Sequence, residues 1–163
     1  MAYYTDFYRR YLIGVGEATI ERYDREESGQ YDGGAWECER LGGRFNFAAL
    51  DTEERAAILH ALNANLPTHT ARISDSGVTS YTIKHAVERY VGFYVSNLQV
   101  KTAMRILGYM RGGGGLNPAY NISRREWRLF AEAAADAERH RHEAGRHEAE
   151  LREHEEGRTS ADW

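Results

Sequence analysis

Two features are scarce in this sequence of 163 residues: cysteine and long apolar runs. No run approaches the ~18 apolar residues of a membrane-spanning helix, and the first residues lack the apolar centre of a secretory signal. The single cysteine, Cys38, cannot form an internal disulfide, which fits a reducing compartment, and it is interpreted as a small buried side chain. We therefore expect a cytoplasmic protein with no membrane partner.

Motifs of catalysis and cofactor binding are also missing. No serine lies in a glycine-framed elbow, no His-Glu-x-x-His sequence occurs, and there is no cysteine pair for a zinc site. The glycine run 112–115 is not followed by the Lys-Ser/Thr of a phosphate loop. We therefore expect that the protein is not an enzyme and that it binds neither a cofactor nor a metal ion.

Charge is unevenly distributed along the chain. Residues 1–79 have a net charge of −5, residues 80–128 of +6, and residues 129–163 of −5. A basic segment between two acidic ones suggests an anionic partner such as DNA or RNA. The alternative is self-complementarity, in which the basic segment pairs with the acidic ends of its own chain.

Apolar side chains recur at helical spacing, which predicts a mainly α fold. A first helix ends at Gly14 and Gly16 and contains an aromatic stripe. Its members are Tyr4, Phe7, Tyr8 and Tyr11. A second helix over about 52–64 begins with a capping box of Asp51 and Glu54. Between the two helices, residues 19–23 could form a strand, and the alternating pattern at 35–41 predicts a second one, so the two could pair as a small β-hairpin.

Two further helices are predicted over residues 80–91 and 96–108. Ser80 and Ser96 or Asn97 begin them, and Gly92 and Gly108 end them. Such a pair resembles a helix-turn-helix, in which the first helix braces a second one whose outer face enters the major groove. Its alternative is a plain packed helix pair with polar outer faces.

The candidate nucleic-acid contacts are polar or basic, because Asn, Gln, Lys and Arg form paired hydrogen bonds with base edges and cations bind phosphates. They are Lys84, Asn97, Gln99, Lys101, Thr102, Arg105, Arg111, Arg124 and Arg125. Asn97, Lys101 and Arg105 lie one turn apart on the expected outer face. Two positions depart from the motif, since Glu88 stands where a small residue is usual and Lys101 lies near a usually apolar position.

A last helix begins at Ser123, which forms a capping box with Glu126. Its apolar stripe ends near Ala134, and from residue 135 on the chain is rich in Ala, Glu, Arg and His, with Leu151 as the one large aliphatic residue. Such a stretch buries little surface and should project, fray or find a partner. We expect a globular domain over 1–134, with a basic module at 80–128, and a charged helical extension over 135–163.

Three histidines recur every seven residues in this extension, at His140, His147 and His154, with Glu143 and Glu150 between them. A rise of 1.5 Å per residue separates successive histidines by about 10 Å, too far to share one ion. We interpret this face as solvated rather than as a metal site.

Three segments of the central region resemble a family of uncharacterised short proteins from actinobacterial phages and mobile elements. The first is Ser80-Tyr81-Thr82-Ile83-Lys84-His85, which Glu88 follows. The second is Gly92-Phe93-Tyr94-Val95-Ser96-Asn97, and the third is Asn117-Pro118-x-Tyr120-Asn121-Ile122-Ser123. The resemblance covers about a quarter of the chain. It implies a phage-type accessory protein in the host cytoplasm, and it assigns no catalytic residue.

Two functions follow as hypotheses. The first is a nucleic-acid-binding accessory or regulatory protein that uses the helix-turn-helix-like module. The second is a protein-interaction module, either an inhibitor of a host factor or a subunit of a virion or homo-oligomer, which acts through residues 135–156 and the acidic flanks. A pocket lined by Lys84, His85, Glu88 and Tyr94, with shifted pKa values, would instead favour an enzyme.

Overall fold

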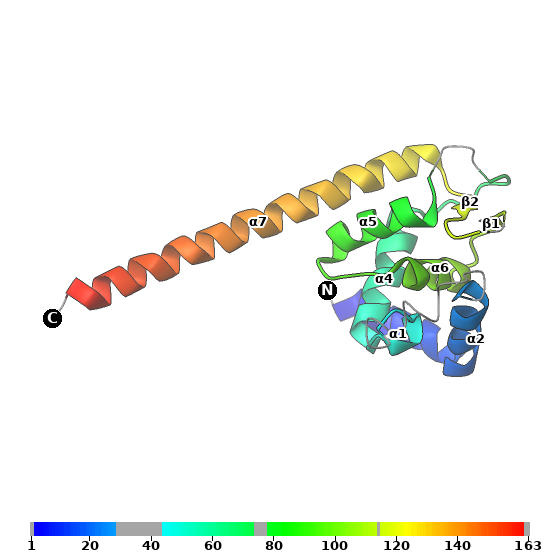
Figure 1. Cartoon of the computed structure of the whole chain (residues 1–163), viewed down its shortest axis with the longest axis horizontal. Helices are drawn as coiled ribbons and strands as arrows, with labels where there is room; N and C mark the ends of the chain where they lie inside the picture. Colours follow the sequence, from blue (N-terminus) through cyan, green and yellow to red (C-terminus); the bar gives the residue numbers. More distant parts are fainter. Residues whose placement is uncertain (1, 29–43, 74–77, 114, 162–163) are drawn as a thin grey trace.

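A computed structural model describes residues 2–28, 44–73, 78–113 and 115–161, and it is mainly helical, as the sequence predicts (Figure 1). The helices are α1 (Ala2–Val15), α2 (Glu17–Ser28), the 3₁₀ turn η1 (Phe47–Ala49), α4 (Thr52–Asn65), α5 (Ser80–Val91), α6 (Asn97–Ile106) and α7 (Arg124–Ala161). A short antiparallel pair joins β1 (Arg111–Gly112) to β2 (Ala119–Tyr120). No helix in these ranges is both long and apolar enough to cross a membrane.

The core lies where α4, α5, α6 and the first turns of α7 meet. Leu59, Val87, Met104 and Phe130 contribute one side chain from each of these helices, and all four are buried. α1 packs against α4, and α2 packs along α6. The basic central helices are therefore enclosed by the N-terminal segment on one side and by α7 on the other.

The strand predicted over residues 19–23 is wrong, because these residues belong to α2. The buried side chains of α2 are Ile20, Asp24 and Glu27, at helical spacing. Two of the three are acidic, so the face that packs on the body is not an apolar one. The second predicted strand, at 35–41, and Cys38 with it lie outside the described residues.

The caps predicted at Asp51 and Ser96 form, whereas the predicted N-cap Ser80 lies inside α5 and only one half of the capping box predicted for α7 forms. Asp51 and Glu54 form the predicted capping box of α4, and Ser96 forms another with Gln99 at the start of α6. α5 begins at Ser80, with Thr79 as its N-cap. At α7 the backbone N–H of Glu126 donates to the Ser123 hydroxyl (3.3 Å), while the Glu126 carboxylate accepts from the Thr68 backbone N–H (2.8 Å).

Gly92 ends α5 in the left-handed region, with φ of +84°. An added Cβ would lie 3.0 Å from Nε of Arg141, a residue of α7. The glycine is thus needed both for the turn and for the close approach of α7.

Gly92→Ala is expected to lower the free energy of unfolding by about 1–3 kcal/mol, because alanine is strained at this φ and crowds Arg141. Urea unfolding followed by circular dichroism measures the change. The matched control is Gly145→Ala, where no atom lies within 4 Å of the new Cβ and where alanine favours the helix. Equal effects of the two substitutions would contradict this account of Gly92.

α7 has two parts that differ in their surroundings. Phe130 and Ala134 are buried against the body, whereas every residue from 141 to 156 is exposed. Figure 1 shows α7 leaving the body and continuing well beyond it. We call residues 141–156 the projecting helix.

Candidate functional site

The polar side chains predicted to face outward from α6 are covered by α2 and by the chain before α4. Lys101 is 0 % exposed, and its Nζ donates to the backbone carbonyl of Glu27 (3.3 Å). The Thr102 hydroxyl donates to Oδ1 of Asp24 (2.7 Å), and Nε2 of Gln99 donates to the carbonyl oxygens of Arg44 and Asn46. The prediction that these three side chains face solvent is therefore wrong. The physical reason is that residues 19–23, expected to form a strand, belong to α2, which packs along α6, while residues 44–46 cover Gln99.

Arginines of the basic segment pair with carboxylates of α2. Arg105 forms an ion pair with Glu26, and its guanidinium lies 4.3 Å from the ring centroid of Tyr23. Nε of Arg111 lies 3.2 Å from Oε2 of the buried Glu27. The self-complementarity considered from the charge pattern is therefore present between α2 and residues 105–111.

The remaining predicted contacts do not share one surface. Nζ of Lys84 pairs with Glu88 (3.1 Å) and lies 5.0 Å from the ring centroid of Tyr94. Nδ2 of Asn97 donates to Oδ1 of Asn117 (3.0 Å), which ties α6 to the loop between β1 and β2. Arg124 and Arg125 are exposed, but they lie in the first turn of α7 rather than on α6.

A buried polar clamp, which the sequence did not reveal, fixes η1. The Asp24 carboxylate accepts hydrogen bonds from the backbone N–H groups of Phe47 (3.1 Å) and Ala48 (2.9 Å). Arg55 of α4 donates to the carbonyl oxygens of the same two residues, and it also pairs with Glu17. Burial raises the pKa of Asp24, while the hydrogen bonds from Ala48, Thr102 and Phe47 oppose that rise.

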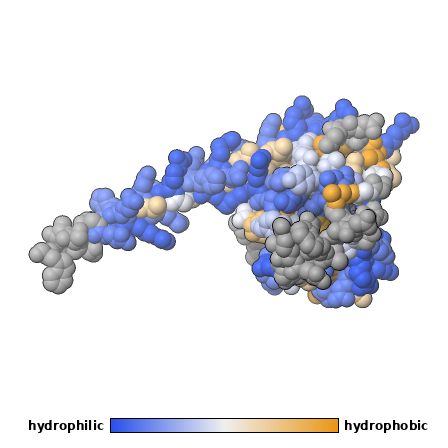
Figure 2. All heavy atoms as spheres, viewed as in Figure 1, coloured by the Kyte–Doolittle hydropathy of each residue, from blue (hydrophilic) through white to orange (hydrophobic). Residues whose placement is uncertain are grey.

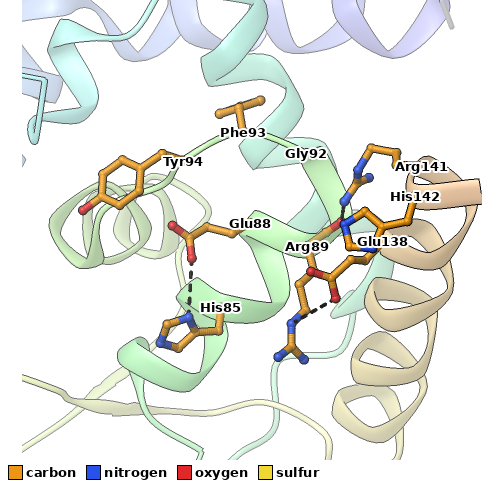
Figure 3. Close-up of a pocket in the computed structure, with 9 residues that line it drawn as sticks. All are labelled: His85, Glu88, Arg89, Gly92, Phe93, Tyr94, Glu138, Arg141 and His142. Atoms are coloured by element: carbon orange, nitrogen blue, oxygen red, sulfur yellow. Dashed lines mark hydrogen bonds and ion pairs between the residues drawn. The ribbon is translucent and has the colours of Figure 1, made fainter. Parts of the chain in front are cut away.

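A hollow of about 460 Å³ lies where α5 meets α7 (Figure 3). Its lining residues are His85, Glu88, Arg89, Gly92, Phe93, Tyr94, Glu138, Arg141 and His142. Three of the four residues expected in a pocket, His85, Glu88 and Tyr94, are therefore brought together, and Lys84 contacts Glu88 and the Tyr94 ring beside them.

Several charged groups around this hollow lie close to a group of opposite charge. Nδ1 of His85 lies 3.4 Å from the Glu88 carboxylate, whose other oxygen accepts from the backbone N–H of Val95 (3.1 Å). On the α7 side, Arg89 pairs with Glu138 (3.6 Å), as Figure 3 shows. Two ion pairs, Lys84–Glu88 and Arg89–Glu138, therefore lie at the walls of this hollow.

Arg141 also joins α7 to α5. Its guanidinium donates to the backbone carbonyls of Arg89 and Tyr90, in the last turn of α5. A cation at the C-terminal end of a helix satisfies otherwise unpaired carbonyls and interacts favourably with the helix dipole. The hollow therefore marks the place where α7 is fastened before it leaves the body.

The projecting helix is the largest exposed element of the described chain that has no role in the core. His140, His147 and His154 are all exposed on or beside it. Within the described ranges, no three His, Cys, Asp or Glu side chains are placed to hold one metal ion.

Comparison with family models, with curated proteins and with solved structures finds no match to this chain. The relation to phage-type accessory proteins stays a prediction that rests on residues 80–123.

Proposed function

We propose that the chain is a protein-interaction module whose folded body holds the projecting helix outward as the docking element. The observation that carries this proposal is the exposure of every residue from 141 to 156. Figure 2 shows this part of α7 standing clear of the body, with a surface that is mostly hydrophilic. Side chains exposed over about four helical turns add little to the core, so their use lies elsewhere.

The base of the helix is fastened, which favours a docking role over a loose tail. Phe130 and Ala134 are buried, the Arg89–Glu138 ion pair bridges α5 and α7, and Arg141 binds the last carbonyls of α5. A binding element that is already ordered and directed loses less conformational freedom on association than a disordered one.

The anchored turns also explain how the projecting helix stays helical without a partner. Starting a helix is costly and extending one is not, so the buried turns around Phe130 supply the nucleus. The projecting part is rich in Ala, Glu and Arg, which are good helix formers.

A cross-linking experiment tests this proposal in full-length protein. A photo-reactive phenylalanine analogue at Leu151, in cells that carry the gene, is expected to capture one defined protein, whereas the same analogue at Glu21, exposed on α2, is not. The captured protein, once purified, should bind Ala149→Pro at least about tenfold more weakly than the unaltered chain, because proline breaks the projecting helix without touching the body. Capture from Glu21 alone, or affinity that is indifferent to Ala149→Pro, would rule the proposal out.

Nucleic-acid binding through the α5–α6 pair stays a prediction, which a gel shift with duplex DNA fragments tests. Arg124 and Arg125 are exposed in the first turn of α7, where a phosphate could approach them. Lys101 and Thr102, by contrast, would have to leave α2 before they could touch a base. The geometry thus supports the protein-interaction module better.

A further inference from the structure

α7 carries a heptad pattern that bears on the chemistry of the partner, and this inference rests on the proposed function. Reading from Phe130, residues at alternating intervals of three and four fall on one stripe of the helix. The a positions are Phe130, Ala137, Ala144 and Leu151, and the d positions are Ala133, His140, His147 and His154. Positions with such spacing form the seam of a coiled coil, in which they are usually apolar, whereas here three of the four d positions are His.

The seam begins inside the body and continues beyond it. Phe130 is buried, Ala133 and Ala137 are half-buried, and Ala144 and Leu151 are exposed, Leu151 to 52 %. We call the exposed members (His140, Ala144, His147, Leu151 and His154) the docking stripe. Ala134, at an e position, is buried as well, so the face that packs on the body shares the a positions of the stripe, and these a positions continue onto the exposed part of the helix.

The residues that flank the docking stripe are acidic. At the g positions stand Asp136, Glu143 and Glu150, and at the e positions Glu148 and Glu155. Arg141 is the exception among the e positions that flank the stripe, and it is hydrogen-bonded to the end of α5. Charges at e and g decide which partner a coiled coil accepts.

A second copy of this chain is a poor occupant of the stripe. In a parallel pair, Glu143 would face Glu148 of the other copy, and Glu150 would face its Glu155. In an antiparallel pair, the g positions of the two copies meet, and all three are acidic. Like charges in register disfavour self-association and select for a partner of opposite charge.

We propose that the projecting helix pairs with an amphipathic helix of another protein, one with a large aliphatic seam and with Lys and Arg at its flanks. The small Ala144 and the single Leu151 leave room for bulky knobs from the partner. The basic flanks of that partner meet Glu143, Glu148 and Glu150.

Two synthetic three-heptad peptides with the same leucine seam test the charge preference. One has Lys and the other Glu at all e and g positions, and binding to the full-length chain is measured by fluorescence anisotropy at about 0.15 M salt. The Lys-flanked peptide is expected to bind at least about tenfold more tightly, because several flanking ion pairs add up.

Matched variants test whether the docking stripe is the face of the projecting helix that binds the peptide. Ala144→Gln, in the docking stripe, is expected to weaken binding of the Lys-flanked peptide about tenfold, since it places an amide in the seam. The control Ala149→Gln makes the same chemical change on the opposite face and is expected to change affinity less than about twofold. In the same way, Glu150→Lys should weaken binding, and Glu153→Lys, away from the flanks, should do so less.

Each outcome decides between named alternatives. Equal effects of Ala144→Gln and Ala149→Gln would mean general charge attraction and would overturn the docking stripe. A dimer of the chain in light scattering would overturn it in favour of a second copy. If the cross-linked partner binds but neither peptide does, the partner chemistry is wrong while the interaction module stands. If the cross-linked partner binds Ala149→Pro as tightly as it binds the unaltered chain, the proposed function itself is wrong.

Discussion

Replacing Asp24 by alanine is expected to lower the free energy of unfolding by about 3–5 kcal/mol. The carboxylate is 2 % exposed and accepts hydrogen bonds from the Phe47 and Ala48 backbone amides and from the Thr102 hydroxyl. Alanine removes the acceptor of three donors in a place where water cannot replace it. Urea unfolding at neutral pH measures the loss. Asp24→Asn keeps one acceptor oxygen and should cost less.

The matched control is Glu21→Ala, which removes an exposed carboxylate from the same helix and should change stability by less than about 0.5 kcal/mol. If Asp24→Ala unfolds at the same denaturant concentration as this control, the clamp around η1 does not stabilise the fold.

The effect of Asp24→Ala should also depend on pH. Burial raises the pKa of Asp24 above its ordinary value of 3.8, so the folded chain holds this proton more firmly than the unfolded chain does. The contribution of the aspartic acid is then greatest when it is protonated, and it falls as the pH rises through the folded-state pKa. The stability lost in Asp24→Ala is therefore expected to be larger near pH 4 than near pH 7, and the opposite trend would contradict this assignment.

Arg55→Met is expected to cost about 2–4 kcal/mol, because the guanidinium supplies donors to the other side of the same segment. Its Nε donates to the Phe47 carbonyl (3.2 Å), a second nitrogen donates to the Ala48 carbonyl, and the ion pair with Glu17 joins α4 to α2. Methionine fills similar space but leaves both carbonyls without this donor. Thermal unfolding measures the change.

Arg10→Met, on the exposed face of α1, is the control, and it should lie within about 0.5 kcal/mol of the unaltered chain. Arg55→Lys keeps the charge but loses the planar fork, so it should recover only part of the stability. Full recovery by lysine would mean that charge alone, rather than the two carbonyl contacts, explains the role of Arg55.

The helices that the sequence predicts well are those with local signals at both ends. Asp51 and Ser96 cap the starts of α4 and α6, and Gly92 and Gly108, both with positive φ, follow the ends of α5 and α6. α2 was missed because its buried face contains Asp24 and Glu27. The contacts that allow these carboxylates to be buried come from residues such as Thr102 and Arg111, far along the chain, and no local pattern reveals them.

The predicted exposure of Gln99, Lys101 and Thr102 on α6 is wrong for a reason that the sequence partly signalled. Lys101 stands near a position that is usually apolar in a helix-turn-helix, and the structure buries it completely. The polar outer face of α6 is thus an inner face toward α2. The pocket suggested by His85, Glu88 and Tyr94 does form, because a helical turn and the short connection after Gly92 bring neighbours in sequence together in space.

Because α7 is held to α5 at Arg141, a small rotation at this junction produces a large displacement at the tip of the projecting helix. About 20 residues extend beyond Arg141 to Ala161, which is roughly 30 Å of helix. A tilt of about 10° at the junction would move the tip by about 5 Å, given that length. If a protein binds the tip as proposed, the hydrogen bonds from Arg141 to the last carbonyls of α5 determine its position relative to the body. Loss of these hydrogen bonds would make that position less defined without unfolding either part.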